Sequence, residues 1–202
     1  MIIGVDFDNT IVQYDDLFHL LALERGLIPP DLPPTKQSVR NYLREIGREP
    51  AWTELQGSTY GPQLHRAIPF PGVLDFFTQC RTRNIEVFIV SHKTRFPIIG
   101  PQHDLHAAAN DWLAANGFYD AARGGLTRRR VHFDLTKDAK LDRIAFLRCT
   151  HFIDDLPEFL AEPTFPSGVH RVLFDPNGSQ LPADSPFVSV SSWPELKAML
   201  IG

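Results

Sequence analysis

Five short apolar runs, each ending in polar residues, constrain the fold of this chain more than any other feature. The runs lie at 2–5, 85–90, 131–133, 150–153 and 169–174. Segments with the apolar spacing of helices lie between and after them, at about 73–83, 103–116, 137–148 and 192–201. Strands that alternate with helices of this length predict an α/β protein built from βαβ units, with a mostly parallel sheet flanked by helices.

The first run leads directly into Asp6-Phe7-Asp8-Asn9-Thr10. Alternation along an extended backbone puts Asp6 and Asp8 on one side and Phe7 on the other. Two carboxylates so close raise each other's proton affinity, so the pair is costly unless a cation or a reacting centre uses it. The alternative is an Asx-turn at which the chain merely bends.

Later runs also end in residues that carry chemistry. Ser91 follows the second run, Asp154-Asp155 follows the fourth, and a lysine stands near 137–140. In open parallel sheets, ligands bind outside the carboxyl ends of the strands. We therefore expect these side chains to converge with Asp6 and Asp8 on one crevice.

Residues 11–68 do not follow the strand–helix rhythm. Helical patterns at about 16–25 and 37–48 are joined by the proline-rich segment 28–34, which should be extended. A small α-helical cap that covers the crevice is expected here, inserted into a core formed by 1–10 and 69–202. The alternatives are a packing appendage or an oligomer interface.

Composition restricts the partners. The net charge of -4 and the pI near 6.0 give no reason to expect nucleic acid or an anionic membrane surface. Cys80 and Cys149 both lie in apolar runs, which is typical of buried thiols in a reducing compartment. No apolar stretch approaches the roughly 20 residues that span a bilayer. We expect a cytoplasmic protein, and its oligomeric state is not readable from these features.

Taken together, the motifs resemble those of the haloacid dehalogenase (HAD) superfamily. The resemblance rests on Asp-x-Asp-x-Thr after the first strand, a serine after the second, a lysine at a helix start and Asp-Asp after a later strand. It covers essentially the whole chain and implies a Rossmann-like core, with a cap between the first and second motifs. It assigns no role to residues 95–130.

The resemblance implies roles for the acidic residues. Asp6 would attack a phosphoryl group and form an aspartyl-phosphate, and Asp8 would act as general acid and base. The carbon–halogen hydrolases of the superfamily do not keep the second aspartate, so Asp8 favours phosphoryl transfer. Clustered carboxylates suit Mg²⁺. The implied ligands are Asp6, the backbone carbonyl of Asp8, Asp155 directly and Asp154 through water, although Asp154-Asp155 could instead cap the next turn.

By the same resemblance, Ser91 would donate its hydroxyl to a phosphoryl oxygen, and a lysine would neutralise the nucleophile and the phosphoryl charge. Thr136 is typical of a helix N-cap, so Lys137 would open the helix and Lys140 would lie one turn inside. We favour Lys140, because Lys137 fits a solvated charge in the first turn. The sequence leaves both open.

Other residues are weaker candidates for substrate binding. Asn9 and Thr10 complete the first motif, and His92 and Lys93 follow Ser91, where they could steer an anionic substrate. In the expected cap, Trp52, Gln56 and Tyr60 could form a binding wall, or they could be ordinary core residues. Arg128–Arg130 is more typical of a solvated loop than of a nucleic-acid site.

These features predict a Mg²⁺-dependent phosphatase that acts on a small phosphorylated metabolite. A phosphomutase or phosphotransferase could use the same residues. A phosphoacceptor domain also uses an acidic cluster, a serine or threonine and a lysine, and a catalytically idle HAD-like binding module is the third alternative. The sequence does not identify the substrate.

Overall fold

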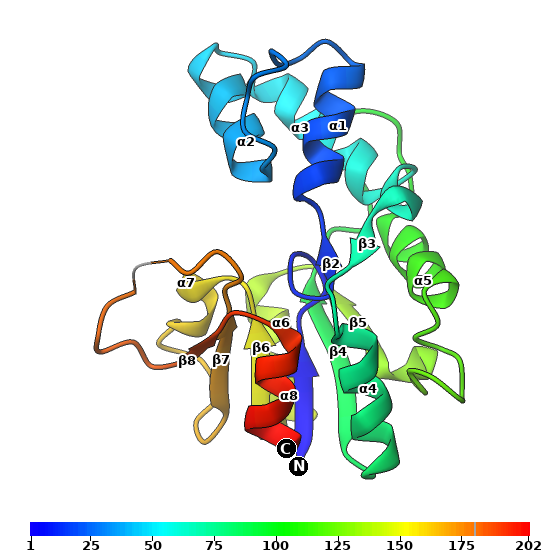
Figure 1. The fold of residues 1–202 in the computed structure, drawn as a ribbon, viewed down its shortest axis with the longest axis vertical. Helices are drawn as coiled ribbons and strands as arrows, with labels where there is room; N and C mark the ends of the chain where they lie inside the picture. The colour runs from blue at the N-terminus through cyan, green and yellow to red at the C-terminus, as the bar shows by residue number, and fades with distance from the viewer. Residues whose placement is uncertain (180) are drawn as a thin grey trace. The chain divides into compact units, whose positions relative to one another are not determined.

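The computed structural model describes residues 1–179 and 181–202, and the chain divides into two compact units. The core unit comprises Met1–Val12, Pro69–Lys93 and Leu113–Gly202. The helical unit comprises Gln13–Ile68 and Thr94–Trp112. Figure 1 shows the elements of both units along the chain.

The core unit contains a six-stranded parallel sheet in the order β5-β4-β1-β6-β7-β8. The strands are β1 (Ile2–Val5), β4 (Glu86–His92), β5 (Val131–Asp134), β6 (His151–Asp154), β7 (His170–Phe174) and β8 (Val188–Val190). The predicted α/β class with a parallel Rossmann-like sheet is therefore confirmed. The short strand β8 was not predicted.

Helices cover both faces of this sheet. They are α4 (Val73–Thr82), α6 (Lys137–Phe146), α7 (Pro157–Leu160) and α8 (Trp193–Ile201), with the 3-10 turn η2 (Arg128–Arg130) before β5. On the face in front in Figure 1, Trp193 of α8 packs against Phe76 of α4 with ring centroids 5.1 Å apart. On the other face, α6 and α7 bury an apolar cluster around Phe152 of β6.

The strand register determines which residues meet at the carboxyl ends. Val5 of β1 lies beside Ile89 of β4 on one side and Ile153 of β6 on the other. The backbone N–H of Asp6 donates to the carbonyl of Ile153 at 2.8 Å, so the pairing continues one residue beyond β1. Asp6 therefore follows β1 at the level where Asp154 ends β6.

The helical unit is built on α1 (Asp15–Glu24), α2 (Lys36–Glu45) and α3 (Glu49–Tyr60), which pack against one another. The 3-10 turn η1 (Leu64–Arg66) follows α3. Phe18 lies 5.0 Å from Trp52 and 5.6 Å from Tyr60, measured between ring centroids. Among the described residues, no helix has both the length and the apolar character needed to cross a membrane.

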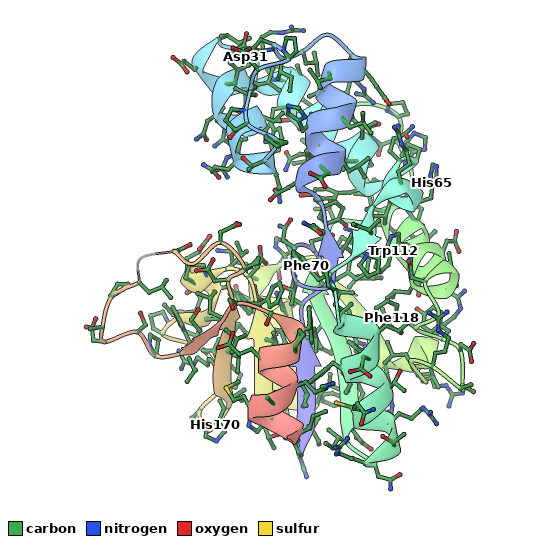
Figure 2. All side chains as sticks on the ribbon, in the orientation of Figure 1. Asp31, His65, Phe70, Trp112, Phe118 and His170 are labelled. Carbon is green, nitrogen blue, oxygen red and sulfur yellow. The ribbon has the colours of Figure 1, made fainter. Side chains whose placement is uncertain are left out.

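The helical unit also includes Thr94–Trp112, which we expected to lie in the core. This segment contains most of α5 (Leu105–Ala115). The indole of Trp112, labelled in Figure 2, donates to the carbonyl of Ala67 at 2.9 Å. Pro97 packs so closely on Gly57 of α3 that a Cβ at Gly57 would lie 2.7 Å from it. These contacts join the segment to the helices.

The other two boundaries lie close to residues 11 and 68. The chain leaves the core unit after Val12 and returns at Pro69. These breaks fall within β2 (Val12–Gln13) and β3 (Ile68–Pro69), which form a separate two-stranded sheet.

Candidate active site

Three carboxylates gather at the carboxyl ends of β1 and β6. Asp6, Asp154 and Asp155 each offer an oxygen, and these oxygens all lie within 4.8 Å of one another. Asp154 is fully buried, Asp6 is 5 % exposed, and Asp155 is half-buried. Such a concentration of negative charge in a buried place requires compensating cations.

Lys140 supplies one of these cations from helix α6. Its ammonium group donates to Asp6 Oδ1 at 2.7 Å and to Asp154 Oδ2 at 2.6 Å. Thr136 caps the helix by accepting from the backbone N–H of Ala139, so Lys137 opens the helix and Lys140 lies one turn inside it. Lys137 is exposed, and its ammonium group lies 4.0 Å from Glu162. Of the two lysines, Lys140 is the one that contacts the acidic group.

Burial and the neighbouring opposite charges shift the pKa values of Asp6 and Lys140 in opposite directions. Burial raises the pKa of Asp6 to about 7, against the lowering effect of Lys140, and Asp154 and Asp8 raise it further. Burial also opposes the charge of Lys140, but Asp154 and Asp6 outweigh that effect and keep the pKa of Lys140 above its usual range. The ammonium group is therefore a permanent cation, whereas Asp6 binds a proton readily when no metal is present.

A second lysine faces Asp8. The ammonium group of Lys93 donates to both carboxylate oxygens of Asp8, at 3.0 and 2.8 Å. Lys93 is only 4 % exposed, whereas the Asp8 side chain is 20 % exposed. The side chains of Asp6 and Asp8 thus have different cationic partners, although only one residue separates them.

The turn after Asp8 is held by the backbone. Asn9 adopts a left-handed conformation with φ of 57°, which asparagine tolerates better than most residues. The backbone N–H groups of Ile11 and Val12 both donate to the carbonyl of Phe7, and the indole of Trp193 donates to the carbonyl of Thr10. Thr10 is fully buried.

Ser91 is buried near the carboxyl end of β4, beside Phe133 of β5 in the register. His92, which follows it, is exposed, and its ring nitrogen lies 3.2 Å from the carbonyl of Leu135.

The acidic group fits Mg²⁺ as a donor set. Three carboxylates provide the hard oxygen ligands that this ion prefers, and it needs few protein ligands because it retains water. Both oxygens of Asp154 are already engaged, one by Lys140 and the other by the backbone N–H of Leu156 at 3.0 Å. Asp154 is therefore less suited to direct coordination of the ion than to a contact through water.

The charges of the site also fit a divalent ion. Four carboxylates, those of Asp6, Asp8, Asp154 and Asp155, face the two ammonium groups of Lys93 and Lys140. When all are ionised, one divalent cation would cancel the remaining charge.

The expected residues of the insert belong to the helical unit, and Trp52 has a clear structural role there. It is 2 % exposed and packs against Phe18, as a core aromatic does. Gln56 and Tyr60 are half-buried on the same helix. Arg128 lies over the ring of Tyr119, and Arg130 lies 3.8 Å from Glu86.

The pairing of Lys93 with Asp8 was not predicted. The sequence placed Lys93 near the site only as a residue that could steer substrate. Its contact depends on the register of β1 against β4, in which Val5 lies opposite Ile89. Alternation alone does not fix that register, so the sequence carried no direct signal for this pair.

Comparison with known proteins gives the fold a name. The sequence matches no family model and no curated protein. A HAD family hydrolase from Deinococcus radiodurans R1 with bound phosphate and sodium is similar in structure, with a TM-score of 0.59, 14% identity, and coverage of 98% of this chain and 93% of that chain.

Two further solved structures are similar to the chain to the same degree. YfnB from Bacillus subtilis, bound to magnesium, has a TM-score of 0.57 and 12% identity, with 100% of this chain and 98% of that chain covered. A dehalogenase has a TM-score of 0.58 and 12% identity, with coverage of 99% and 96%. The chain therefore has the fold of the HAD superfamily.

Proposed function

We propose that the protein is a Mg²⁺-dependent phosphatase that hydrolyses a small phosphorylated metabolite through an aspartyl-phosphate. The observation that carries the proposal is the hydrogen-bonded group of Asp6, Lys140 and Asp154 beside Asp155, with Asp8 two residues after Asp6. The fold supports a HAD-type hydrolase but not one reaction, because solved structures of this fold include a dehalogenase.

The proposed reaction has two steps on the same carboxylate. A carboxylate oxygen of Asp6 attacks phosphorus, and the bond from phosphorus to the leaving oxygen breaks while Asp8 gives that oxygen a proton. Water then attacks the phosphorus of the aspartyl-phosphate, Asp8 takes its proton, and Asp6 is released together with inorganic phosphate. Asp8 therefore ends the cycle in the protonation state in which it began.

Lys140 and the buried Ser91 serve the phosphoryl group in this scheme. The ammonium group of Lys140 holds Asp6 in place and offsets negative charge at the transferring group. The Ser91 hydroxyl is proposed to donate to a phosphoryl oxygen. When bound, Mg²⁺ would add further neutralisation of the phosphoryl oxygens, held by Asp6, Asp155, the backbone carbonyl of Asp8 and, through water, Asp154.

The proposed substrate is small because of the position of the insert in the sequence. About 55 residues follow the first motif directly, where a cap over the crevice is expected, and covered crevices suit metabolites better than macromolecules. His92, Asn9 and Thr10 remain candidates for substrate binding. Asp8 favours phosphate esters over organohalides, because a dehalogenase requires no acid at this position.

The decisive experiment is release of inorganic phosphate from an aryl phosphate by the purified protein. We expect turnover that requires Mg²⁺, stops with a chelator, and is abolished in Asp6→Asn. Chloride release from a 2-chloro acid under the same conditions tests the dehalogenase reaction, and isomerisation of a phosphosugar tests the mutase reaction. A stable aspartyl-phosphate without turnover, or no reaction with any phosphate ester, would refute the proposal.

A further inference from the structure

The contact between Lys93 and Asp8 is more specific than an ordinary ion pair. One ammonium group bonds to both oxygens of one carboxylate, at 3.0 and 2.8 Å, and the lysine side chain is 3% exposed. A carboxylate held through both oxygens has little freedom to rotate. The lysine thus determines the direction in which Asp8 presents its oxygens.

Lys93 is itself held at two points. Its backbone N–H donates to the carbonyl of Asp134 at 2.9 Å, which anchors the end of β4 to the end of β5. Its ammonium group lies 5.5 Å from the centroid of the Phe7 ring, which is fully buried. A group fixed by a neighbouring strand and an aromatic ring can orient its partner.

Stability is a poor explanation for this arrangement. Removing a charged lysine from water is costly, and a buried ion pair is often no more stable than an apolar pair of similar size. The exposed pair of Lys197 and Asp75, with an N–O distance of 2.6 Å, shows that this chain also forms lysine–aspartate contacts at its surface. Burial of Lys93 beside a motif aspartate therefore points to a role in the reaction.

We propose that Lys93 is a positioning residue that holds the Asp8 side chain in line for its proton transfers: the ammonium group bonds to both oxygens when Asp8 is ionised, and to one oxygen when the other carries the proton that goes to the leaving oxygen. This inference rests on the proposed phosphatase function and deepens it. The two lysines then divide the site: Lys140 serves Asp6 and Asp154, and Lys93 serves Asp8. Lys93 acts through Asp8 and does not need to contact the substrate.

The test compares leaving groups in Lys93→Met, which keeps an unbranched side chain and removes the charge. Nitrophenyl phosphate has a leaving group that departs without much help from an acid, whereas phenyl phosphate requires one. We expect kcat to fall about 10- to 100-fold on phenyl phosphate and much less on nitrophenyl phosphate. Lys197→Met is the matched control and should leave both rates unchanged. Equal losses on both substrates would overturn the proposal.

A double-mutant cycle with Asp8→Asn separates action through Asp8 from any other action. If Lys93 works by orienting Asp8, adding Lys93→Met to Asp8→Asn should change kcat less than twofold, because the proton donor is already gone. If the fold-loss in kcat of the double variant instead equals the product of the losses of the two single variants, the inference is refuted. Lys93→Gln is the second variant, because its amide can still donate to Asp8: it should keep more activity on phenyl phosphate than Lys93→Met, and a loss as large as that of Lys93→Met in a protein that melts like the wild type would count against the inference.

The outcomes are distinguishable from a failure of the proposed function. An inactive wild-type protein overturns the phosphatase proposal and this inference together. An active wild type, silenced by Asp6→Asn but not altered in its leaving-group preference by Lys93→Met, overturns only the role of Lys93.

Discussion

Lys140 has two hydrogen-bonded carboxylate partners and almost no contact with solvent. We therefore expect its replacement to lower both the stability of the fold and the rate of the proposed reaction. Removing one member of a buried ionic group leaves the others uncompensated. The same ammonium group offsets charge at the proposed nucleophile. These two effects predict one variant with two measurable defects.

We predict that Lys140→Met lowers the free energy of unfolding of the metal-free protein by about 3–5 kcal/mol. We also expect a loss of at least about 100-fold in kcat, as for other electrostatic groups at transition states. Urea unfolding and phosphate release measure the two effects. Lys137→Met, on the exposed face of the same helix turn, should be near wild type in both. The reverse pattern would make Lys137 the motif lysine.

His151 and His170 form a stacked pair of rings at the amino ends of β6 and β7. Their rings are stacked with centroids 4.9 Å apart, and His170 is labelled in Figure 2. Burial lowers the pKa of His151, and the neighbouring His170 lowers it further. The unfolded chain therefore binds this proton more readily than the folded protein. The resulting stability is present above pH of about 6.5 and is lost as the pH falls below it.

An NMR titration of the histidine ring protons tests this pair. We expect the pKa of His151 to lie below that of an ordinary histidine and to rise in His170→Gln. A pKa of His151 that does not respond to this substitution would exclude the influence of His170.

At the residue scale, the sequence was sufficient to bring the aspartates to one edge. Alternation placed Asp6 and Asp8 on one side, and the rule for parallel sheets placed Asp154 beside them. It was insufficient wherever a side chain's partner depends on register or on helix orientation. The choice between Lys137 and Lys140 and the partner of Lys93 are both of this kind.

At the scale of the elements, β1 depends on a glycine. A Cβ on Gly4 would lie 2.5 Å from a ring carbon of Phe152 on the adjacent strand. Phe152 is fully buried among α6 and α7, so its ring has little room to move. The close approach of this ring to the backbone of the central strand explains why glycine stands here.

We predict that Gly4→Ala lowers the free energy of unfolding by about 1–3 kcal/mol, the usual cost of overpacking a core. Chemical denaturation measures it. Combining Gly4→Ala with Phe152→Leu should cost less than the sum of the two separate losses, because the smaller side chain makes room. Strict additivity would mean that the ring is not the obstacle.

The elements themselves differ in how well the sequence predicts them. The β-branched run at 85–90 and the helix near 137–148 have strong periodicity, and both are present as β4 and α6. The three residues of β8 give too little periodicity to detect. Segment 94–112 joins the helical unit through contacts with Ala67 and Gly57 that are made over long distances in sequence, so periodicity carries no signal for them.

At the scale of the whole molecule, metal binding and folding should be coupled through Asp6. Burial raises the pKa of Asp6 to about 7, so the metal-free fold favours the protonated acid and loses that advantage as the pH rises through this value. A divalent cation needs the ionised carboxylate and competes with the proton. Its stabilising effect should therefore be greater on the alkaline side of pH 7.

We predict that Mg²⁺ raises the melting temperature of the wild type more at pH 8 than at pH 6, by mass action on the folded state. Asp155→Asn should reduce the shift at both values, whereas Asp75→Asn, at the surface of α4, should not. Melting curves with and without the ion measure this. A shift that is independent of pH would argue against Asp6 as a ligand.

The helical unit is composed of two stretches that are far apart in sequence, and the chain passes between the units four times. Exchange of this unit with that of another protein would therefore require transplanting Gln13–Ile68 and Thr94–Trp112 together. If only Gln13–Ile68 were replaced by the stretch of another protein, the Trp112 indole would lose its native acceptor at Ala67. Pro97 would then also face a foreign helix in place of Gly57. Recombination at the two obvious junctions alone should give insoluble hybrids.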